Sequence, residues 1–319
     1  MSVWEFILEK LNARQNLVLL FVLESKGSSP GRKGFKMAVA KDGIYGTIGG
    51  GIMEHKLVEK AKAMLQQGSQ TVLLMKQYHD KEHTNDRSGM ICSGSQLNVF
   101  IPLSVKDQFT IERVISEQTN TIQLSPGGLK ITGEPAEGLR YNTDTDWIYS
   151  EPVNQQPVIH IIGGGHIGLA LSELMHYLGF YIKLYDDRPG LNTIAANSFA
   201  QEKHIINYES AGEYFKGIEN DFAVILTVGY RTDKIVLKQL VHKPFFYLGL
   251  LGSDHKINML LSELEAEGID THLLQNIHTP IGINIFSKTA REIAVSIAAE
   301  IIREKNKELP TGRQGQVRC

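Results

Sequence analysis

The chain has 319 residues, of which 42% are hydrophobic, and this length predicts two globular domains. Its 33 basic and 35 acidic residues nearly cancel, which argues against a general nucleic-acid binder. With only two cysteines, Cys92 and Cys319, a disulfide framework is not expected, and a reducing cytoplasm is the simplest location. The acidic N-terminus does not resemble a signal peptide, and no run approaches 18 apolar residues, so no membrane span is expected.

Residues 1–104 predict an N-terminal α/β domain. Ser2 and Glu5 form a capping box for a first helix. Apolar runs and turn signals then predict strands over residues 17–23, 35–40, 44–48, 71–75 and 96–101, and a helix over residues 52–67.

The turn Gly49-Gly50-Gly51 lies between a predicted strand and this helix. Glycines let backbone amides converge at a helix N-terminus, so the turn could cradle a phosphate. Tight packing between strand and helix explains the same spacing equally well. The nearby side chains of Arg32, Lys33 and Lys36 could complete an anion pocket, although basic residues in a loop are usually only solvated.

Cys92 follows a polar stretch, residues 76–91, which predicts an exposed loop. A thiolate at this junction could bind a soft metal or carry sulfur, whereas the alternative is a buried, inert cysteine. Neither cysteine has a partner at C-x-x-C spacing, so structural zinc is not expected. His79 and His83 lie in the polar stretch without a third ligand and are interpreted as surface residues.

Residues 105–156 have a weak pattern. They contain the turn-forming run Pro126-Gly127-Gly128 and short alternations such as Trp147-Ile148-Tyr149. The pattern predicts a helix near residues 106–118, followed by small hairpins in a linker between two domains.

Residues 157–187 predict a Rossmann unit. A buried strand over residues 158–162 runs into Gly163, Gly165 and Gly168, which fit G-x-G-x-x-G at the start of a helix. A second strand, over residues 181–185, ends at Asp186. An acid at this position accepts a hydrogen bond from the adenine ribose in dinucleotide sites, and it favours NAD over NADP.

The domain continues over residues 157–305 as alternating strands and helices, which is typical of a doubly wound parallel sheet. Further strands are expected at residues 204–206, 222–228 and 245–250, helices near 191–198, up to 240, up to 268 and over 289–305, and a mobile polar tail over 306–319. His166, inside the glycine turn, would face a ligand or cap the helix. No Ser-His-Asp order or H-E-x-x-H occurs, so ligand binding is indicated more clearly than turnover.

Several motifs together resemble the XdhC/CoxI family of xanthine dehydrogenase accessory proteins. They run nearly the whole chain in the family's order: Gly27-Ser28-Ser29-Pro30, Gly34-Phe35-Lys36-Met37, Gly46-Thr47-Ile48-Gly49-Gly50-Gly51, Glu54, Gly163-Gly164-Gly165-His166-Ile167, Asp186-Asp187-Arg188-Pro189, the run from Tyr247 to Ser253, Pro280-Ile281-Gly282 and the run from Glu292 to Glu300.

This resemblance implies a chaperone of the molybdenum cofactor. Such a protein would hold the molybdopterin-bound metal, support its sulfuration with a cysteine desulfurase, and deliver it to an apo xanthine dehydrogenase-type enzyme. It would place the pterin phosphate at the glycine turns and Cys92 near molybdenum. A homodimer is the default expectation. Two alternatives stay open: an NAD-dependent oxidoreductase built on the Rossmann domain, and a scaffold with a vestigial nucleotide site.

Overall fold

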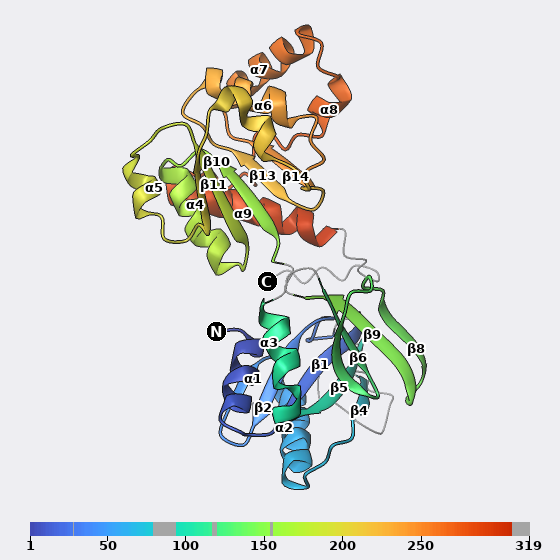
Figure 1. Cartoon of the computed structure of the whole chain (residues 1–319). Helices are drawn as coiled ribbons and strands as arrows, with labels where there is room; N and C mark the ends of the chain where they lie inside the picture. Colours follow the sequence, from blue (N-terminus) through green and yellow to red (C-terminus); the bar gives the residue numbers. More distant parts are fainter. Residues whose placement is uncertain (28, 79–93, 117–119, 154–155, 308–319) are drawn as a thin grey trace. The chain divides into compact units, whose positions relative to one another are not determined.

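The computed structural model describes residues 1–27, 29–78, 94–116, 120–153 and 156–307. The chain divides after Gln155 into two compact units (Figure 1). The N-terminal unit combines two antiparallel sheets with helices, and the C-terminal unit has one parallel sheet between helices. Each unit has its own hydrophobic core, so each is described by itself.

The larger sheet of the N-terminal unit has five antiparallel strands in the order β3-β2-β1-β5-β4. These strands are β1 (Leu17–Gly27), β2 (Lys36–Ala40), β3 (Ile44–Gly46), β4 (Leu73–Tyr78) and β5 (Gly94–Leu103). The central strand β1 is buried on both faces, because helices cover both sides of the sheet.

Alternate side chains of β1 enter two different cores, as the two-residue repeat of a strand requires. Leu19 and Phe21 pack with helices α1 (Val3–Asn12) and α3 (Gln108–Ser116). Leu20 faces the other way and packs with helix α2 (Gly51–Gln66). Residues 17–23 therefore form a continuous apolar run, which the sequence predicted as a buried strand.

The segment predicted as a linker, residues 105–156, folds as part of the N-terminal unit instead. It forms a short helix η1 (Val105–Asp107), α3, and a four-stranded antiparallel sheet in the order β7-β6-β9-β8. Its strands are β6 (Thr121–Ser125), β7 (Gly128–Thr132), β8 (Gly138–Thr143) and β9 (Asp146–Pro152).

The sequence pattern of this segment is weak because each strand contributes only a few side chains to the core. Trp147 and Tyr149 of β9 are buried in the core that contains α1 and α3, whereas most of β8 is exposed. The contribution of these strands to a shared core, rather than an independent one, hides their role in the sequence.

The C-terminal unit confirms the predicted doubly wound parallel sheet. Its five strands follow the order β12-β11-β10-β13-β14, and every pair of neighbours is parallel. They are β10 (Val158–Ile162), β11 (Tyr181–Asp186), β12 (Glu202–Ile205), β13 (Phe222–Ile225) and β14 (Tyr247–Leu250).

Helices cover both faces of this sheet (Figure 1). Helices α4 (His166–Tyr177) and α9 (Ala290–Lys307) pack on one face, where they bury Ile159 and Ile161 of β10. The other face carries η2 (Tyr208–Tyr214), α6 (Tyr230–Leu240) and α7 (Asp254–Ala266). The remaining helices are α5 (Asn192–Ala196) and α8 (Thr271–Gln275).

The strand order reverses between β10 and β13, so the loops that leave these two strands diverge to opposite faces. In open parallel sheets the crevice at such a reversal, at the carboxyl ends of the strands, is where ligands bind. The β10–α4 turn and the β13–α6 loop therefore form the candidate ligand-binding edge of the C-terminal unit.

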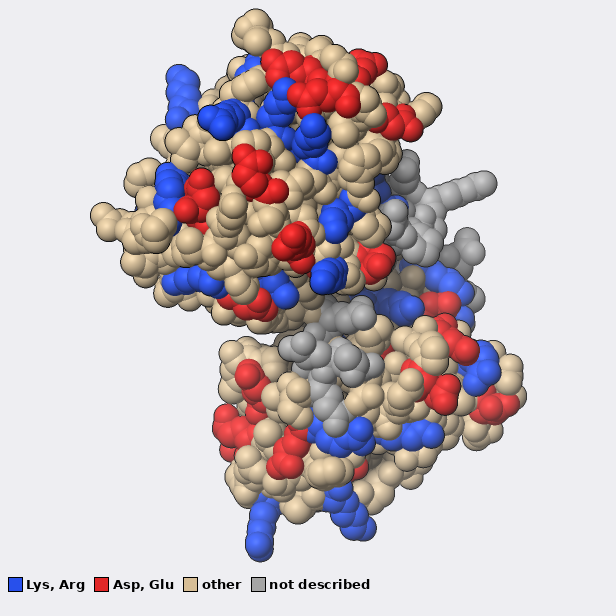
Figure 2. Space-filling view, turned by 45° about the horizontal axis from the view of Figure 1, so that its top comes forward, with Lys and Arg blue, Asp and Glu red and all other residues tan. Residues whose placement is uncertain are grey.

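No helix among the described residues is long and apolar enough to cross a membrane. On the face drawn in Figure 2, basic and acidic side chains are interspersed, and neither sign dominates.

Candidate functional site

The β10–α4 turn is shaped by close backbone contacts at two of its glycines. A methyl group at Gly163 would lie 2.3 Å from the carbonyl oxygen of Leu226, and the φ angle of Gly163 is +125°. A methyl group at Gly168 would lie 2.1 Å from the carbonyl oxygen of Gly163. These two glycines let β10, β13 and α4 pack together, so they position the site rather than contact a ligand directly.

Gly165 differs from both. Its φ angle of −70° suits any residue, and an added methyl group would meet no atom of the described chain within 4 Å. It caps α4, and the side chain of the next residue, His166, is exposed. The first backbone amides of a helix have no partner within it and favour an anion. The open side of the predicted turn is therefore at Gly165 and His166.

Asp186 closes the other side of the turn, and its carboxylate is completely buried. Oδ2 accepts hydrogen bonds from the amide of Gly164 at 2.7 Å and from Nη2 of Arg188 at 2.8 Å. Oδ1 accepts from the amide and Nε of Arg188, at 2.9 and 2.8 Å. Burial raises the pKa of Asp186, but the hydrogen bonds from Arg188 and Gly164 outweigh it and leave the pKa below its usual value.

This geometry does not fit the predicted role of Asp186 in binding a ribose. Each of its oxygens already accepts two hydrogen bonds from the chain, and none of its surface is exposed to a ligand. An adenosine ribose would have to displace Arg188 to reach the carboxylate. The group that the end of β11 offers to a ligand is thus the guanidinium of Arg188.

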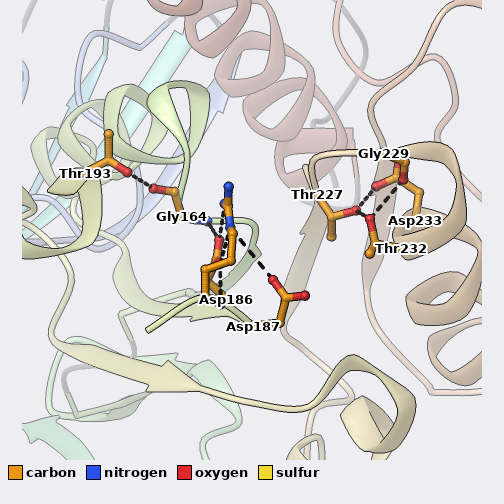
Figure 3. Close-up of polar contacts among 9 residues, drawn as sticks. Gly164, Asp186, Asp187, Thr193, Thr227, Gly229, Thr232 and Asp233 are labelled. Atoms are coloured by element: carbon orange, nitrogen blue, oxygen red, sulfur yellow. Dashed lines mark hydrogen bonds and ion pairs between the residues drawn. The ribbon is translucent and has the colours of Figure 1, made fainter. Parts of the chain in front are cut away.

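Helix α5 holds the same turn from a third direction (Figure 3). The hydroxyl of Thr193 donates a hydrogen bond to the carbonyl oxygen of Gly164 at 2.5 Å. The side chain of Ile194 would lie 2.5 Å from a methyl group at Gly164, so that position also requires glycine. Contacts within the chain thus fix the turn without a ligand.

Across the strand reversal, the β13–α6 loop carries a second polar cluster (Figure 3). Asp233 is 1% exposed; its carboxylate accepts a hydrogen bond from the hydroxyl of Thr227 at 2.5 Å and pairs closely with Nζ of Lys256. The hydroxyl of Thr232 lies 2.7 Å from that of Thr227. Burial raises the pKa of Asp233, and the hydrogen bonds from Lys256 and Thr227 only partly oppose this effect.

In the N-terminal unit, the turn Gly49-Gly50-Gly51 already holds an anion, which is the chain's own Glu54. One carboxylate oxygen of Glu54 accepts hydrogen bonds from the amides of Ile48 and Gly50, both at 3.0 Å, and from the hydroxyl of Thr47 at 2.6 Å. The predicted phosphate cradle is therefore filled by a side chain from the first turn of α2.

The three glycines of this turn have positive φ angles, between +73° and +128°. Gly49 also needs to lack a side chain, because a methyl group there would lie 2.4 Å from the amide nitrogen of Gly31. Packing against the loop that contains Gly31 explains Gly49, which is the structural alternative left open by the sequence.

Two of the three basic residues considered for an anion pocket point elsewhere. Lys36 pairs with Glu151 of β9 at 3.1 Å and lies over the rings of Trp4 and Phe21. These rings belong to the core on the α1 side of the sheet, opposite α2 and its glycine turn. Lys33 lies over the ring of Tyr149, also on the α1 side. Arg32 is exposed.

A buried polar network ties the N-terminal glycine turn to the sheet. The side chain of Gln96 accepts from Ser29 at 2.9 Å and from the amide of Gly31 at 3.2 Å, and it donates to the carbonyl oxygen of Ile48 and to Asn98. Gln96 lies on β5, two residues after the strand begins at Gly94. The network thus fixes the turn relative to the start of β5.

Cys92, His79 and His83 lie outside the described residues. Within the described ranges, no group of three or more histidine, cysteine, aspartate or glutamate side chains could hold a metal ion. The predicted role of Cys92 as a soft metal ligand stays a prediction.

Sequence reasoning missed Thr227, Asp233 and Lys256 as one cluster. Asp233 and Lys256 lie 23 residues apart in the chain, and no motif spacing links them. A signal did exist: both residues follow buried strands of a predicted parallel sheet, whose carboxyl ends meet at one edge.

The two units and the carboxyl-edge site define a class of protein, an α/β protein whose C-terminal unit is a Rossmann domain. Residues 159–301 match the family model described as XdhC Rossmann domain, and residues 11–78 match the model described as XdhC and CoxI family. The chain belongs to the XdhC and CoxI family.

Three curated relatives are similar to the chain. The uncharacterized protein YqeB of Escherichia coli is 28% identical over 89% of this chain and 43% of its own length. A probable xanthine dehydrogenase subunit of Bacillus subtilis is 27% identical over 53% of this chain and 49% of its own length. The molybdenum cofactor insertion chaperone PaoD of E. coli is 23% identical over 94% of this chain and 87% of its own length. The chain thus spans less than half the length of the first two.

A solved structure shares the fold along the chain. The crystal structure of a xanthine dehydrogenase from Bacillus halodurans covers 98% of both chains with a TM-score of 0.73 and 21% sequence identity. At this identity the likeness shows the fold alone.

Proposed function

We propose that the protein is an accessory chaperone that binds the molybdenum cofactor as cargo, supports its sulfuration and inserts it into a xanthine dehydrogenase-type molybdenum hydroxylase. The observation that carries the proposal is the open N-terminus of α4. The glycine turn before it is already rigid, and at Gly165 it leaves free space beside exposed His166.

The chemistry of this edge suits an anionic, ring-bearing cargo. The free amides of α4 attract a phosphate, such as the phosphate of a pterin cofactor. Among the described residues the edge lacks an assembled nucleophile–base set, which suits binding better than turnover. The likeness to PaoD over nearly the whole chain supports the same function.

Cargo binding is tested on protein made in a host that synthesises molybdopterin. The bound small molecules are extracted and measured by pterin fluorescence and by mass. We expect near-stoichiometric pterin in the wild-type protein and strong loss in Gly165→Val, because the added side chain would fill the open space while φ stays acceptable. Tyr177→Ala, at the 85% exposed far end of α4, is the matched control and should retain pterin. A wild-type protein without pterin would contradict the proposal.

Cys92 is proposed as a ligand or sulfur carrier for the metal. Cys92→Ala should reduce the molybdenum that copurifies with the protein, without a change in melting temperature, because the role requires a thiolate. Cys319→Ala provides a matched control that removes the other cysteine. Equal molybdenum content in both variants would remove Cys92 from the site.

The client and partners follow from this proposal. We propose an apo xanthine dehydrogenase-type enzyme as the receiver, a cysteine desulfurase as the sulfur donor and a homodimer as the working form. Purified components test all three: the loaded chaperone should restore activity to the apo enzyme, and desulfurase should increase that activity. Light scattering gives the oligomeric state. Unloaded protein is the control for activity transfer.

The second candidate, an NAD-dependent oxidoreductase, has the fold in its favour but not Asp186. The buried carboxylate of Asp186 has no free oxygen lone pair directed at a ribose. This candidate expects NAD at millimolar concentration to raise the melting temperature by mass action. The chaperone proposal expects little response to NAD.

A further inference from the structure

The end of β11 presents a guanidinium where the adenosine ribose of a Rossmann ligand lies. Nε and Nη2 of Arg188 bind the two oxygens of Asp186 in a bidentate pair, each at 2.8 Å. The side chain of Arg188 is 38% exposed, and its Nη1 has no hydrogen-bond acceptor among the described residues. The planar guanidinium is therefore fixed on one edge and has donors free on the other.

This guanidinium lies beside the α4 terminus. Nη2 of Arg188 and the amide of Gly164 both donate to the same oxygen of Asp186, and Gly164 immediately precedes the open position Gly165. Two kinds of anion-binding group, a helix terminus and an arginine fork, thus converge next to one buried carboxylate (Figure 3).

We propose that Arg188 recognises a phosphate monoester on the ligand of the C-terminal unit, and that Asp186 is a positioning residue that aims the guanidinium. A guanidinium near the ribose is the arrangement that accommodates a 2′-phosphate in Rossmann sites, whereas a free carboxylate selects the unmodified ribose. The site therefore favours ligands with such a phosphate, either a phosphorylated nucleotide or, resting on the proposed function, a pterin phosphate.

One nearby charge opposes this binding. The carboxylate of Asp187 is 39% exposed and lies 3.8 Å from Nε of Arg188. It acts on a ligand largely through water, whereas Arg188 donates directly, so the direct hydrogen bonds should prevail. Asp187→Asn should accordingly strengthen phosphate binding, in contrast to substitutions of Arg188.

The test uses the full-length protein and two probes that differ by one phosphate, NADP and NAD, with dissociation constants measured by calorimetry at fixed salt. We expect NADP to bind about tenfold tighter, about 1.4 kcal/mol. Arg188→Gln should remove this preference, and Arg188→Lys should restore only part of it, because an ammonium cannot form the bidentate pair. Asp186→Asn should lower the preference while the protein stays folded. Lys238→Gln, an exposed substitution on α6, is the control.

Equal affinity for the two probes, an unchanged preference in Arg188→Gln, or no binding of either probe at millimolar concentration would overturn the assignment for nucleotides. For a pterin cargo, the readout is the pterin retained by Arg188→Gln in the extraction experiment, and full retention would overturn it there. A preference for NADP in a protein that never carries pterin would reject the chaperone proposal and leave the role of Arg188 standing.

Discussion

The carboxylate of Asp186 accepts a hydrogen bond from the backbone amide of Gly164 at 2.7 Å and thereby joins the end of β11 to the turn after β10. This contact spans 22 residues of sequence and links the two loops that build the site. Because the contact requires an ionised carboxylate, it makes the shape of the turn sensitive to acid.

We expect a measurable acid limb in the stability of the C-terminal unit. The pKa of Asp186 is lowered in the folded state, so its contribution is fully present above the unfolded value of 3.8 and is lost as the pH falls through the lower folded value. Urea denaturation between about pH 5 and about pH 2.5 measures this slope. Asp186→Asn should be less stable than wild type at neutral pH and should have a shallower slope below pH 3.8. Parallel curves would contradict the prediction.

Gly163 and Gly165 should respond oppositely to the same substitution. Gly163→Ala would force a methyl group to within 2.3 Å of a carbonyl oxygen at a φ angle of +125°, and it should destabilise the unit by about 3 kcal/mol or more. Gly165→Ala meets no atom within 4 Å and should change stability by less than about 1 kcal/mol. Chemical denaturation measures both, and similar losses in the two variants would show that the turn differs from this geometry.

Lys256 should stabilise the protein more than an exposed lysine does. Lys256→Met leaves the buried carboxylate of Asp233 without its counter-ion, which costs about 3–5 kcal/mol. Lys238→Met removes a surface pair with Glu267 and should cost about 0–1 kcal/mol.

The two lysine variants should also differ in pH dependence. Loss of Lys256 raises the pKa of Asp233 further, so the folded state holds a proton that the unfolded state releases, and stability falls as the pH rises. The deficit of Lys256→Met should therefore be larger at about pH 8 than at about pH 5. A deficit that does not vary with pH would mean that Asp233 is not the group left unpaired.

Glu54 should be needed for the N-terminal glycine turn. Glu54→Gln replaces a carboxylate that accepts three hydrogen bonds with an amide, and we expect a loss of about 1–3 kcal/mol. Glu59→Gln, on the same helix and in an exposed pair with Lys62, should cost no more than about 0.5 kcal/mol. Hydrogen exchange of the amides of Ile48 and Gly50 gives a local readout, and unchanged protection in Glu54→Gln would exclude the role.

The sequence was sufficient for the C-terminal fold because each of its central strands is buried on both faces. Residues 158–162 and 222–225 are continuous apolar runs, and the glycines and Asp186 between them have fixed spacings. Such local patterns survive in the sequence whatever the rest of the chain does. The four-stranded sheet of residues 121–152 lacked this property, because it completes a core that begins at Trp4.

The residues of the site were easier to find than their contacts. Gly163, Gly165, Gly168 and Asp186 do meet at one turn, as the G-x-G-x-x-G spacing predicts. Spacing could not reveal that Arg188 covers Asp186, because a bidentate pair depends on side-chain direction. Nor could it reveal that Glu54 fills the other glycine turn, because a phosphate and a glutamate satisfy the same amides.

The seat of Glu54 has a consequence for ligand competition. Its carboxylate is tethered one helical turn from the amides it occupies, so its local concentration there far exceeds that of any dissolved anion, on the order of millimolar or more. Phosphate from the medium would have to expel this internal competitor before it gained a single hydrogen bond. The N-terminal turn is thus a permanently occupied seat, and selection among free anions is left to the unguarded terminus of α4.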